Sequence, residues 1–176
     1  MTTKILLAGF GGQGILFAGK FLAYAGLVEG REVTWMPSYG PEMRGGLSNC
    51  SVIISDAPIS SPLVPVPDAL VVLNLPSFTR FEPDVKAGGL LLVDSSLIDL
   101  TSAREDLRAY YIPSTRLADD EDLSGLANMI MLGKLLKETA LVRPETLRRA
   151  MEKVVPARKA DLLEKNLRAL ALGQGI

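Results

Sequence analysis

The chain has 176 residues, of which 48% are hydrophobic, and carries 19 basic against 20 acidic side chains. This length suits one domain with a sizeable core, and the balanced charge argues against non-specific binding of nucleic acid. The sequence has no histidine and a single cysteine, Cys50. It therefore lacks the commonest general base and metal ligand, and it cannot form an internal disulfide or hold an iron–sulfur cluster by itself.

The apolar residues do not predict a membrane span or a secretory signal. No apolar run reaches the roughly 18 residues needed to cross a bilayer, because Lys20 interrupts the longest one. The first residues show neither a basic segment nor a cleavage-site pattern. We therefore expect a cytoplasmic protein, and any metal or redox centre connected with it should lie on another chain.

The first half of the chain alternates strands with a helix. Residues Lys4–Gly9 form an apolar run typical of a buried strand, and the pattern from Gly12 to Glu29 predicts a helix that is apolar on nearly every face. A second strand, Glu32–Met36, is bounded by Pro37, and a third covers Leu47–Ser55. The prolines of the following segment, DAPISSPLVPVPD, predict an irregular loop.

The second half adds further strands and then turns helical. Ala69–Leu73 and Leu90–Val93 are continuous aliphatic runs, typical of parallel strands buried on both faces, and Ala109–Ile112 is a further strand. Three helices follow, at Leu126–Thr139, at Pro144–Val155 and at Asp161–Leu172, the last with Gly173 as its stop. This order predicts one α/β domain over residues 1–176, with an open, mostly parallel, Rossmann-like sheet, helices on both faces and a helical C-terminal tail.

The stretch GFGGQG, residues 9–14, follows a strand and opens a helix, as the dinucleotide-binding fingerprint requires. That site also needs an acidic residue at the end of the second strand, where this sequence reads TWMPSYG, and Glu32 stands too early. A phosphate loop is also disfavoured, because Phe21 rather than Ser or Thr follows Lys20. Two interpretations stay open: a helix N-terminus that holds an anionic or carbonyl group, or a tight turn that binds nothing.

A second polar and glycine-rich stretch, PSYGPEMRGG, covers residues 37–46 at the end of the second strand. Open α/β sheets bind ligands outside the carboxyl ends of their strands. The polar residues at the predicted strand ends should gather on that same edge: Gln13, Ser38, Asn74 and Asp94. The alternative is an ordinary solvated loop with an ion pair between Glu42 and Arg44.

Together, GFGGQG and, about thirty residues later, YGPEMRGG resemble the gamma subunit or gamma domain of the 2-oxoacid:ferredoxin oxidoreductases, which act on pyruvate, 2-oxoglutarate, ketoisovalerate or indolepyruvate. The resemblance continues through SNCSVIISD, GGLLLVDSS, LANMIMLG and KNLRALALG, so it covers nearly the whole chain. It implies ligand- or partner-binding residues in two loops: Gly9, Gly11, Gly12, Gln13 and Gly14 in the first, and Tyr39, Glu42, Arg44, Gly45 and Gly46 in the second.

The resemblance implies a non-catalytic subunit of a larger enzyme. The family joins a 2-oxoacid, coenzyme A and oxidised ferredoxin to give acyl-CoA, carbon dioxide and reduced ferredoxin, using thiamine diphosphate with magnesium and iron–sulfur clusters. This sequence has no G-D-G…N thiamine signature and no cysteine array. Alpha and beta chains are thus expected to bind thiamine diphosphate, and beta or a ferredoxin-like delta chain to hold the clusters. The isolated chain is expected to bind none of these cofactors and could self-associate.

Two other functions stay open from the residues alone: a free-standing Rossmann-type NAD(P)-dependent reductase and a small-molecule-binding regulatory module. The sequence does not fix the 2-oxoacid, although PSYGPEMRGG favours 2-oxoglutarate or a branched-chain oxoacid. The sequence also gives structural expectations for Cys50 and Gly12. Cys50, in the middle of an apolar strand, should be an inert packing residue. A β-branched residue in place of Gly12, at a helix start packed close to its strand, should clash or force an unfavourable backbone.

Overall fold

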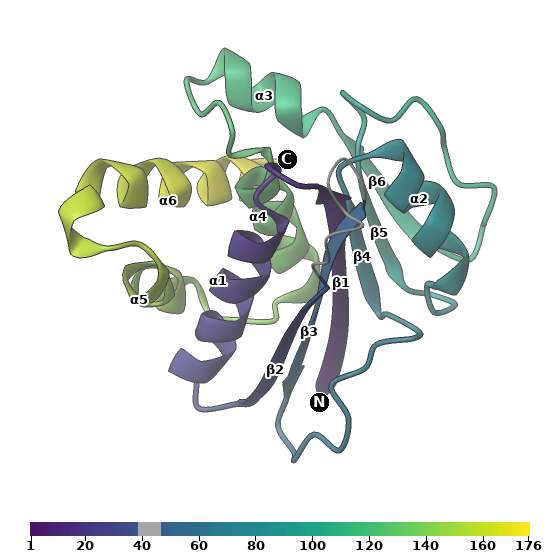
Figure 1. Ribbon diagram of the computed structural model, residues 1–176, viewed down its shortest axis with the longest axis horizontal. Coiled ribbons are helices and arrows are strands. Elements are labelled where there is room, and N and C mark those ends of the chain that lie inside the picture. The colour runs from purple at the N-terminus through teal and green to yellow at the C-terminus, as the bar shows by residue number, and fades with distance from the viewer. Residues whose placement is uncertain (39–46) are drawn as a thin grey trace.

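The computed structural model describes residues 1–38 and 47–176 (Figure 1). Within these residues one six-stranded sheet has the strand order β2-β3-β1-β4-β5-β6. Its strands are β1 (Thr2–Phe10), β2 (Glu32–Ser38), β3 (Leu47–Ser55), β4 (Ala69–Val72), β5 (Leu90–Asp94) and β6 (Arg108–Ile112).

The sheet is mostly parallel, as predicted. The pairs β1–β4, β4–β5 and β5–β6 are parallel, while β3 is antiparallel to both β1 and β2. In the register, Leu7 of β1 lies opposite Cys50 of β3 and Val71 of β4. All strands except β3 therefore run in one direction, and their carboxyl ends lie along one edge of the sheet.

Helices cover both faces of the sheet, which confirms the predicted layers, and a helical segment ends the described chain (Figure 1). The helices are α1 (Ile15–Val28), α2 (Leu75–Phe81), α3 (Ser114–Asp120), α4 (Ala127–Thr139), α5 (Pro144–Val154) and α6 (Ala160–Gly175), with short 3₁₀ turns η2 (Glu82–Asp84) and η3 (Ala157–Lys159). One face carries α1, α4, α5 and α6, and the other carries α2.

Successive side chains of β1 point to opposite faces of the sheet, and each face has its own hydrophobic core. Leu7 points into the larger core, which it shares with α1 and α4, whereas Leu6 points into a smaller core beneath α2 that also holds Phe78. The strands β4 and β5 are buried along their whole length, because each of their faces meets one of these cores. This explains their continuous aliphatic sequence.

Helix α1 is apolar on nearly every face because it is enclosed by the sheet on one side and by α4 and α5 on the other. Two glycines bring it close to the sheet. A Cβ at Gly19 would overlap the sulfur of Cys50, and one at Gly26 would lie 2.8 Å from Cγ2 of Val33. No helix in the described ranges is long and apolar enough to cross a membrane.

Several predicted boundaries were wrong. Helix α1 begins at Ile15 rather than Gly12, because a turn comes first. Pro37 lies inside β2, which is an edge strand and so tolerates a residue without an N–H. Gly173 does not stop α6 but lies within it, where a Cβ would overlap the carbonyl oxygen of Ile130 in α4. Helices α2 and α3 were not predicted, since each is only 7 residues long.

Candidate functional site at the glycine loop

The glycine loop, residues 9–14, joins β1 to α1 by a tight turn. The backbone N–H of Gln13 donates to the carbonyl oxygen of Phe10 at 3.2 Å. Gly12 and Gly14 have φ angles of +95° and +72°, in the left-handed region that residues with a Cβ rarely adopt. Gly14 is the N-cap of α1 and forms no side-chain cap. The first N–H groups of the helix are therefore left for solvent, a ligand or a partner.

The side chain of Gln13 fastens this loop to the neighbouring strand. Its Oε1 accepts a hydrogen bond from the N–H of Phe10 at 2.6 Å, and its Nε2 donates to the carbonyl oxygen of Leu73 at 2.8 Å. Gly9 makes room for it, because a Cβ there would lie 2.5 Å from Oε1. Both polar atoms of Gln13 are thus engaged within the chain.

The bond between Gln13 and Leu73 spans the crevice between the carboxyl ends of β1 and β4. The helix after β1 packs on one face and the helix after β4 on the other, so this crevice is the topological switch point at which open α/β sheets bind ligands. In this chain the side-chain amide of Gln13 bridges the crevice. Glu32 begins β2 at the opposite edge, and Lys20 lies inside α1. This arrangement speaks against both a dinucleotide site and a phosphate loop.

Asn128, near the start of α4, holds the glycine loop from a second direction. The side chain is only 3% exposed, and its Nδ2 donates to the carbonyl oxygen of Gly14 at 2.9 Å. That oxygen also accepts from the N–H of Ala18, the first hydrogen bond of α1. Sequence reasoning missed Asn128. The available signal was an asparagine in the apolar stretch LANMIMLG, since a buried amide requires partners.

The outer side of the glycine loop is open. Among residues 1–38 and 47–176, a Cβ at Gly11 or Gly12 would meet no atom within 4 Å. Two cavities of about 260 Å³ each flank the loop. The first lies toward α3 and α4 and is bordered among others by Gln13, Leu73, Thr115, Asp119 and Ser124. The second lies at the first turn of α1 and is bordered among others by Phe10, Leu16, Phe17 and Ser48.

The other polar residues predicted at strand ends lie at the same edge, since Ser38 and Asp94 end β2 and β5 and Asn74 follows β4, but Asn74 and Asp94 serve the fold. Asn74 caps α2, since its Oδ1 accepts from the N–H of Ser77 at 2.8 Å. Asp94 is completely buried and accepts from Thr115 Oγ1 at 2.5 Å, which ties β5 to the start of α3. Ser38 ends β2 and borders a separate cavity.

The second predicted loop cannot be compared with the structure. Tyr39, Glu42, Arg44, Gly45 and Gly46 lie outside the described residues. Their part in binding therefore stays a prediction.

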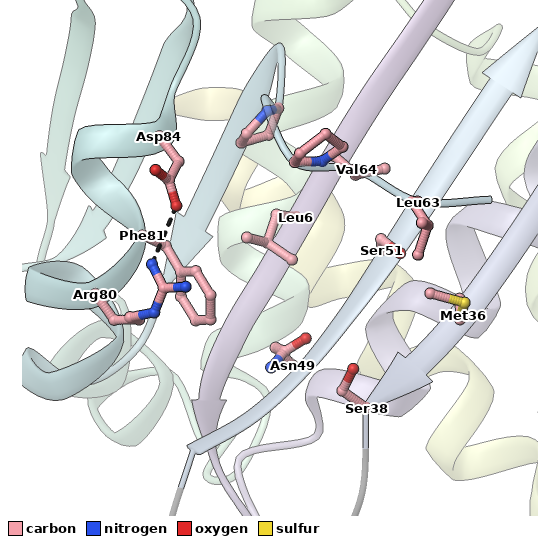
Figure 2. A pocket seen from close by; sticks show the side chains of 12 residues that line it. Leu6, Met36, Ser38, Asn49, Ser51, Leu63, Val64, Arg80, Phe81 and Asp84 are labelled. Carbon is pink, nitrogen blue, oxygen red and sulfur yellow. Dashed lines mark hydrogen bonds and ion pairs between the residues drawn. The ribbon is translucent and has the colours of Figure 1, made fainter. Parts of the chain in front are cut away.

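A cavity of about 330 Å³ lies on the sheet face that carries α2, away from the glycine loop (Figure 2). Leu6, Met36 and Ser51 form its floor on three neighbouring strands, and Leu63 reaches over it from the proline-rich segment. At one side Arg80 and Asp84 form an ion pair of 3.1 Å. The cavity is mainly apolar, and sequence reasoning did not anticipate it.

Cys50 is fully buried, as expected of a packing residue. Its Sγ donates to the carbonyl oxygen of Ile15 at 3.4 Å. Burial raises the pKa of the Cys50 thiol to about 12, so the thiol is neutral at physiological pH. Of the two causes expected at Gly12, the backbone conformation applies, because its φ is +95°, and close packing against the strands is found at Gly19 and Gly26 instead.

The chain was compared with known proteins. The pyruvate ferredoxin/flavodoxin oxidoreductase family matches residues 4–175. The chain is 42% identical to the 2-oxoglutarate synthase subunit KorC of Methanocaldococcus jannaschii, over 98% of this chain and 92% of KorC. It is 44% identical to the ketoisovalerate oxidoreductase subunit VorA of Methanothermobacter marburgensis, over 76% of this chain but only 28% of VorA.

Solved structures agree with these sequence relatives. The gamma subunit of a keto/oxoacid ferredoxin oxidoreductase from Geobacter sulfurreducens superposes with a TM-score of 0.83 at 31% identity, covering 97% of this chain and 95% of that subunit. The 2-oxoglutarate:ferredoxin oxidoreductase of Magnetococcus marinus gives 0.87 at 24% identity, over 99% of this chain and 30% of that one, a likeness of fold alone. The glycine loop thus belongs to a gamma-subunit fold, and the chain is a member of the pyruvate ferredoxin/flavodoxin oxidoreductase family.

Proposed function

We propose that the chain is the gamma subunit of a 2-oxoacid:ferredoxin oxidoreductase. Such an enzyme converts a 2-oxoacid and coenzyme A to acyl-CoA and carbon dioxide, and the two electrons released reduce ferredoxin. The observation that carries this proposal is the end-to-end similarity to KorC, which the chain matches over 92% of its length. The gamma-subunit fold supports it.

The chain contributes to this reaction only within an assembly. Alpha and beta chains bind thiamine diphosphate and magnesium, and beta or a ferredoxin-like delta chain carries the iron–sulfur clusters. A single cysteine and the absence of histidine from the sequence fit this division of labour. We place the assembly in the cytoplasm and treat residues 1–176 as one domain of it.

Within the assembly, the glycine loop faces coenzyme A. The open outer side of Gly11 and Gly12 lets a ligand approach the backbone closely. The uncapped first turn of α1 offers N–H groups and a positive dipole end, which favour an anionic group such as a phosphate of coenzyme A. Gln13 supports the loop rather than binding the ligand, because both of its polar atoms are already bonded.

The second loop supplies a charge at the subunit junction. We assign Arg44 a charge-assisted contact with a partner chain or with coenzyme A, because a guanidinium flanked by Gly45 and Gly46 is accessible to another backbone and offers planar donors. If the contact is with the partner, Arg44→Ala weakens assembly by roughly 2 kcal/mol or more. If it is with coenzyme A, assembly survives and KM for coenzyme A rises. Wild-type assembly with wild-type kinetics would refute this role.

Reconstitution with alpha and beta chains encoded beside this one tests the function and identifies the substrate. The complete assembly should reduce ferredoxin in the presence of coenzyme A and one of three acids: 2-oxoglutarate, ketoisovalerate or pyruvate. The names of the relatives and the second loop favour the first two. Omission of this chain should abolish coenzyme A-dependent turnover.

The competing reductase function predicts that the isolated chain binds NAD(P)(H), whereas the gamma-subunit function predicts that it does not. The isolated chain should bind neither NAD(H) nor thiamine diphosphate in a calorimetric titration, because the switch crevice is bridged by Gln13 and the ribose-binding acid is missing. A dissociation constant in the low micromolar range for either cofactor would overturn the proposed function.

A further inference from the structure

The glycine loop is held at two points by two amide side chains. Gln13 ties it to the sheet through Leu73, and Asn128 ties it to α4 through Gly14. Asn128 covers Gly14 so closely that a Cβ on Gly14 would overlap its Nδ2. Helix α4 thereby contacts the loop through Asn128, although more than a hundred positions separate Asn128 from Gly14 in the sequence.

The amide of Asn128 is fixed in orientation. Its Oδ1 accepts from the N–H of Met129 at 2.9 Å, so Nδ2 is the atom that points to Gly14. The helix that carries it is rigidly seated, because Gly133 of α4 and Gly173 of α6 bring the two helix backbones into contact. The position of α4 therefore determines where the carbonyl oxygen of Gly14 lies, and with it the first turn of α1.

We propose that Asn128 is a positioning residue for the coenzyme A contact of the glycine loop. It does not touch the ligand. It holds the carbonyl oxygen of Gly14, so that the N–H groups at the start of α1 and the open backbone at Gly11 and Gly12 keep one arrangement before coenzyme A arrives. The inference rests on the proposed function for the identity of the ligand, and on the two hydrogen bonds of Asn128 for the positioning.

A matched pair of variants separates positioning from plain stability. Asn128→Asp keeps the shape of the side chain and its acceptor but replaces the donor to Gly14 with a carboxylate oxygen. Asn166→Asp is the control: Asn166 is an equally buried asparagine of α6, 1% exposed, whose Nδ2 donates to the carbonyl oxygen of Leu162 at 2.7 Å, away from the loop. Each variant loses one buried amide-to-carbonyl hydrogen bond.

Two measurements are made on both variants. In the isolated full chain, hydrogen exchange of the peptide covering residues 9–17 should speed up about tenfold in Asn128→Asp and stay near the wild-type rate in Asn166→Asp. In the reconstituted complex, KM for coenzyme A should rise about tenfold in Asn128→Asp alone. The values of kcat and of KM for the 2-oxoacid should change less than about twofold.

Equal effects of the two variants in both measurements would overturn the proposal, as would faster exchange without a rise in KM for coenzyme A. If the aspartate variants do not fold, Asn128→Ser and Asn166→Ser make the same comparison without a buried charge. A wild-type complex without coenzyme A-dependent activity would count against the proposed function instead. The exchange measurement on the isolated chain would then still decide whether Asn128 positions the loop.

Discussion

The sheet face that carries α1, α4, α5 and α6 and the opposite face, which carries α2 and the proline-rich segment 56–68, differ in how closely they are covered (Figure 1). On the first face, glycines allow close approach: a Cβ at Gly19 would overlap the sulfur of Cys50 in β3, and one at Gly133 would overlap the carbonyl oxygen of Leu170 in α6. On the second face, a cavity of about 330 Å³ remains between α2 and the strands (Figure 2). Tight packing on one side thus supports a loop whose outer side is open.

This difference explains where the candidate site can form. The first turn of α1 and Asn128 both belong to the closely packed face, so the glycine loop at its rim has firm support. The cavity of the other face is lined by side chains such as Leu6, Met36 and Asn49. The glycine loop therefore rests on closely packed residues, whereas the cavity of the other face is incompletely filled by the residues that line it.

The largest effect is expected from truncating neighbouring leucines of β1. Leu7→Ala removes a side chain from the closely packed core and should lower the free energy of unfolding by about 4 kcal/mol, whereas Leu6→Ala, beside the existing cavity, should cost about 2.5 kcal/mol. Urea unfolding of both variants measures the difference. Equal losses would show that the two faces are packed alike.

The next effect concerns the crossing of α4 and α6. Gly173→Ala places a Cβ against the carbonyl oxygen of Ile130 and should cost about 3 kcal/mol by overpacking. Gly175→Ala, in the same helix, meets no atom of the described residues within 4 Å and should be neutral or slightly stabilising. Thermal unfolding compares them. A Gly173→Ala variant as stable as wild type would mean that the two helices can separate freely.

A smaller effect is expected at the glycine loop itself. Gly12→Ala should destabilise the chain by about 1–2 kcal/mol, because its φ of +95° strains any residue with a Cβ although the space around it is open. Gly11→Ala, which has the same open space without a positive φ, is the control and should be near neutral. If both variants lose the same stability, crowding rather than backbone conformation would be responsible.

The smallest effect on stability is expected from a comparison of thiol reactivity on the two faces of the sheet. Cys50 should resist alkylation in the native chain at pH 8, because it is buried and its pKa of about 12 keeps the thiol neutral. Ser51→Cys adds a thiol that borders the cavity of the other face and should be alkylated. Mass spectrometry counts the labels. Two labels on Ser51→Cys, or one on the wild-type chain, would show that the closely packed face opens readily.

Much of the fold follows from local patterns. The aliphatic runs that became β4 and β5 indicated strands buried on both faces, and the bounds of β3 were predicted to the residue. The pattern could not reveal α2 and α3, because 7 residues give too few turns for a helical period to stand out. Nor could it show that β3 runs antiparallel, since a buried strand has the same composition in either direction.

For the site, the sequence alone indicated that residues 9–14 connect a strand to a helix, with a tight turn as one of two interpretations, and that the motifs resemble those of one family. Only the tertiary structure decided what each residue does there. Gly12 and Gly14 are required by backbone angles, Gln13 bridges to Leu73, and Asn128 reaches Gly14 from a distant helix. Local propensity and periodicity act between near neighbours in the chain, whereas these hydrogen bonds join atoms that only the packing of helices against the sheet brings together.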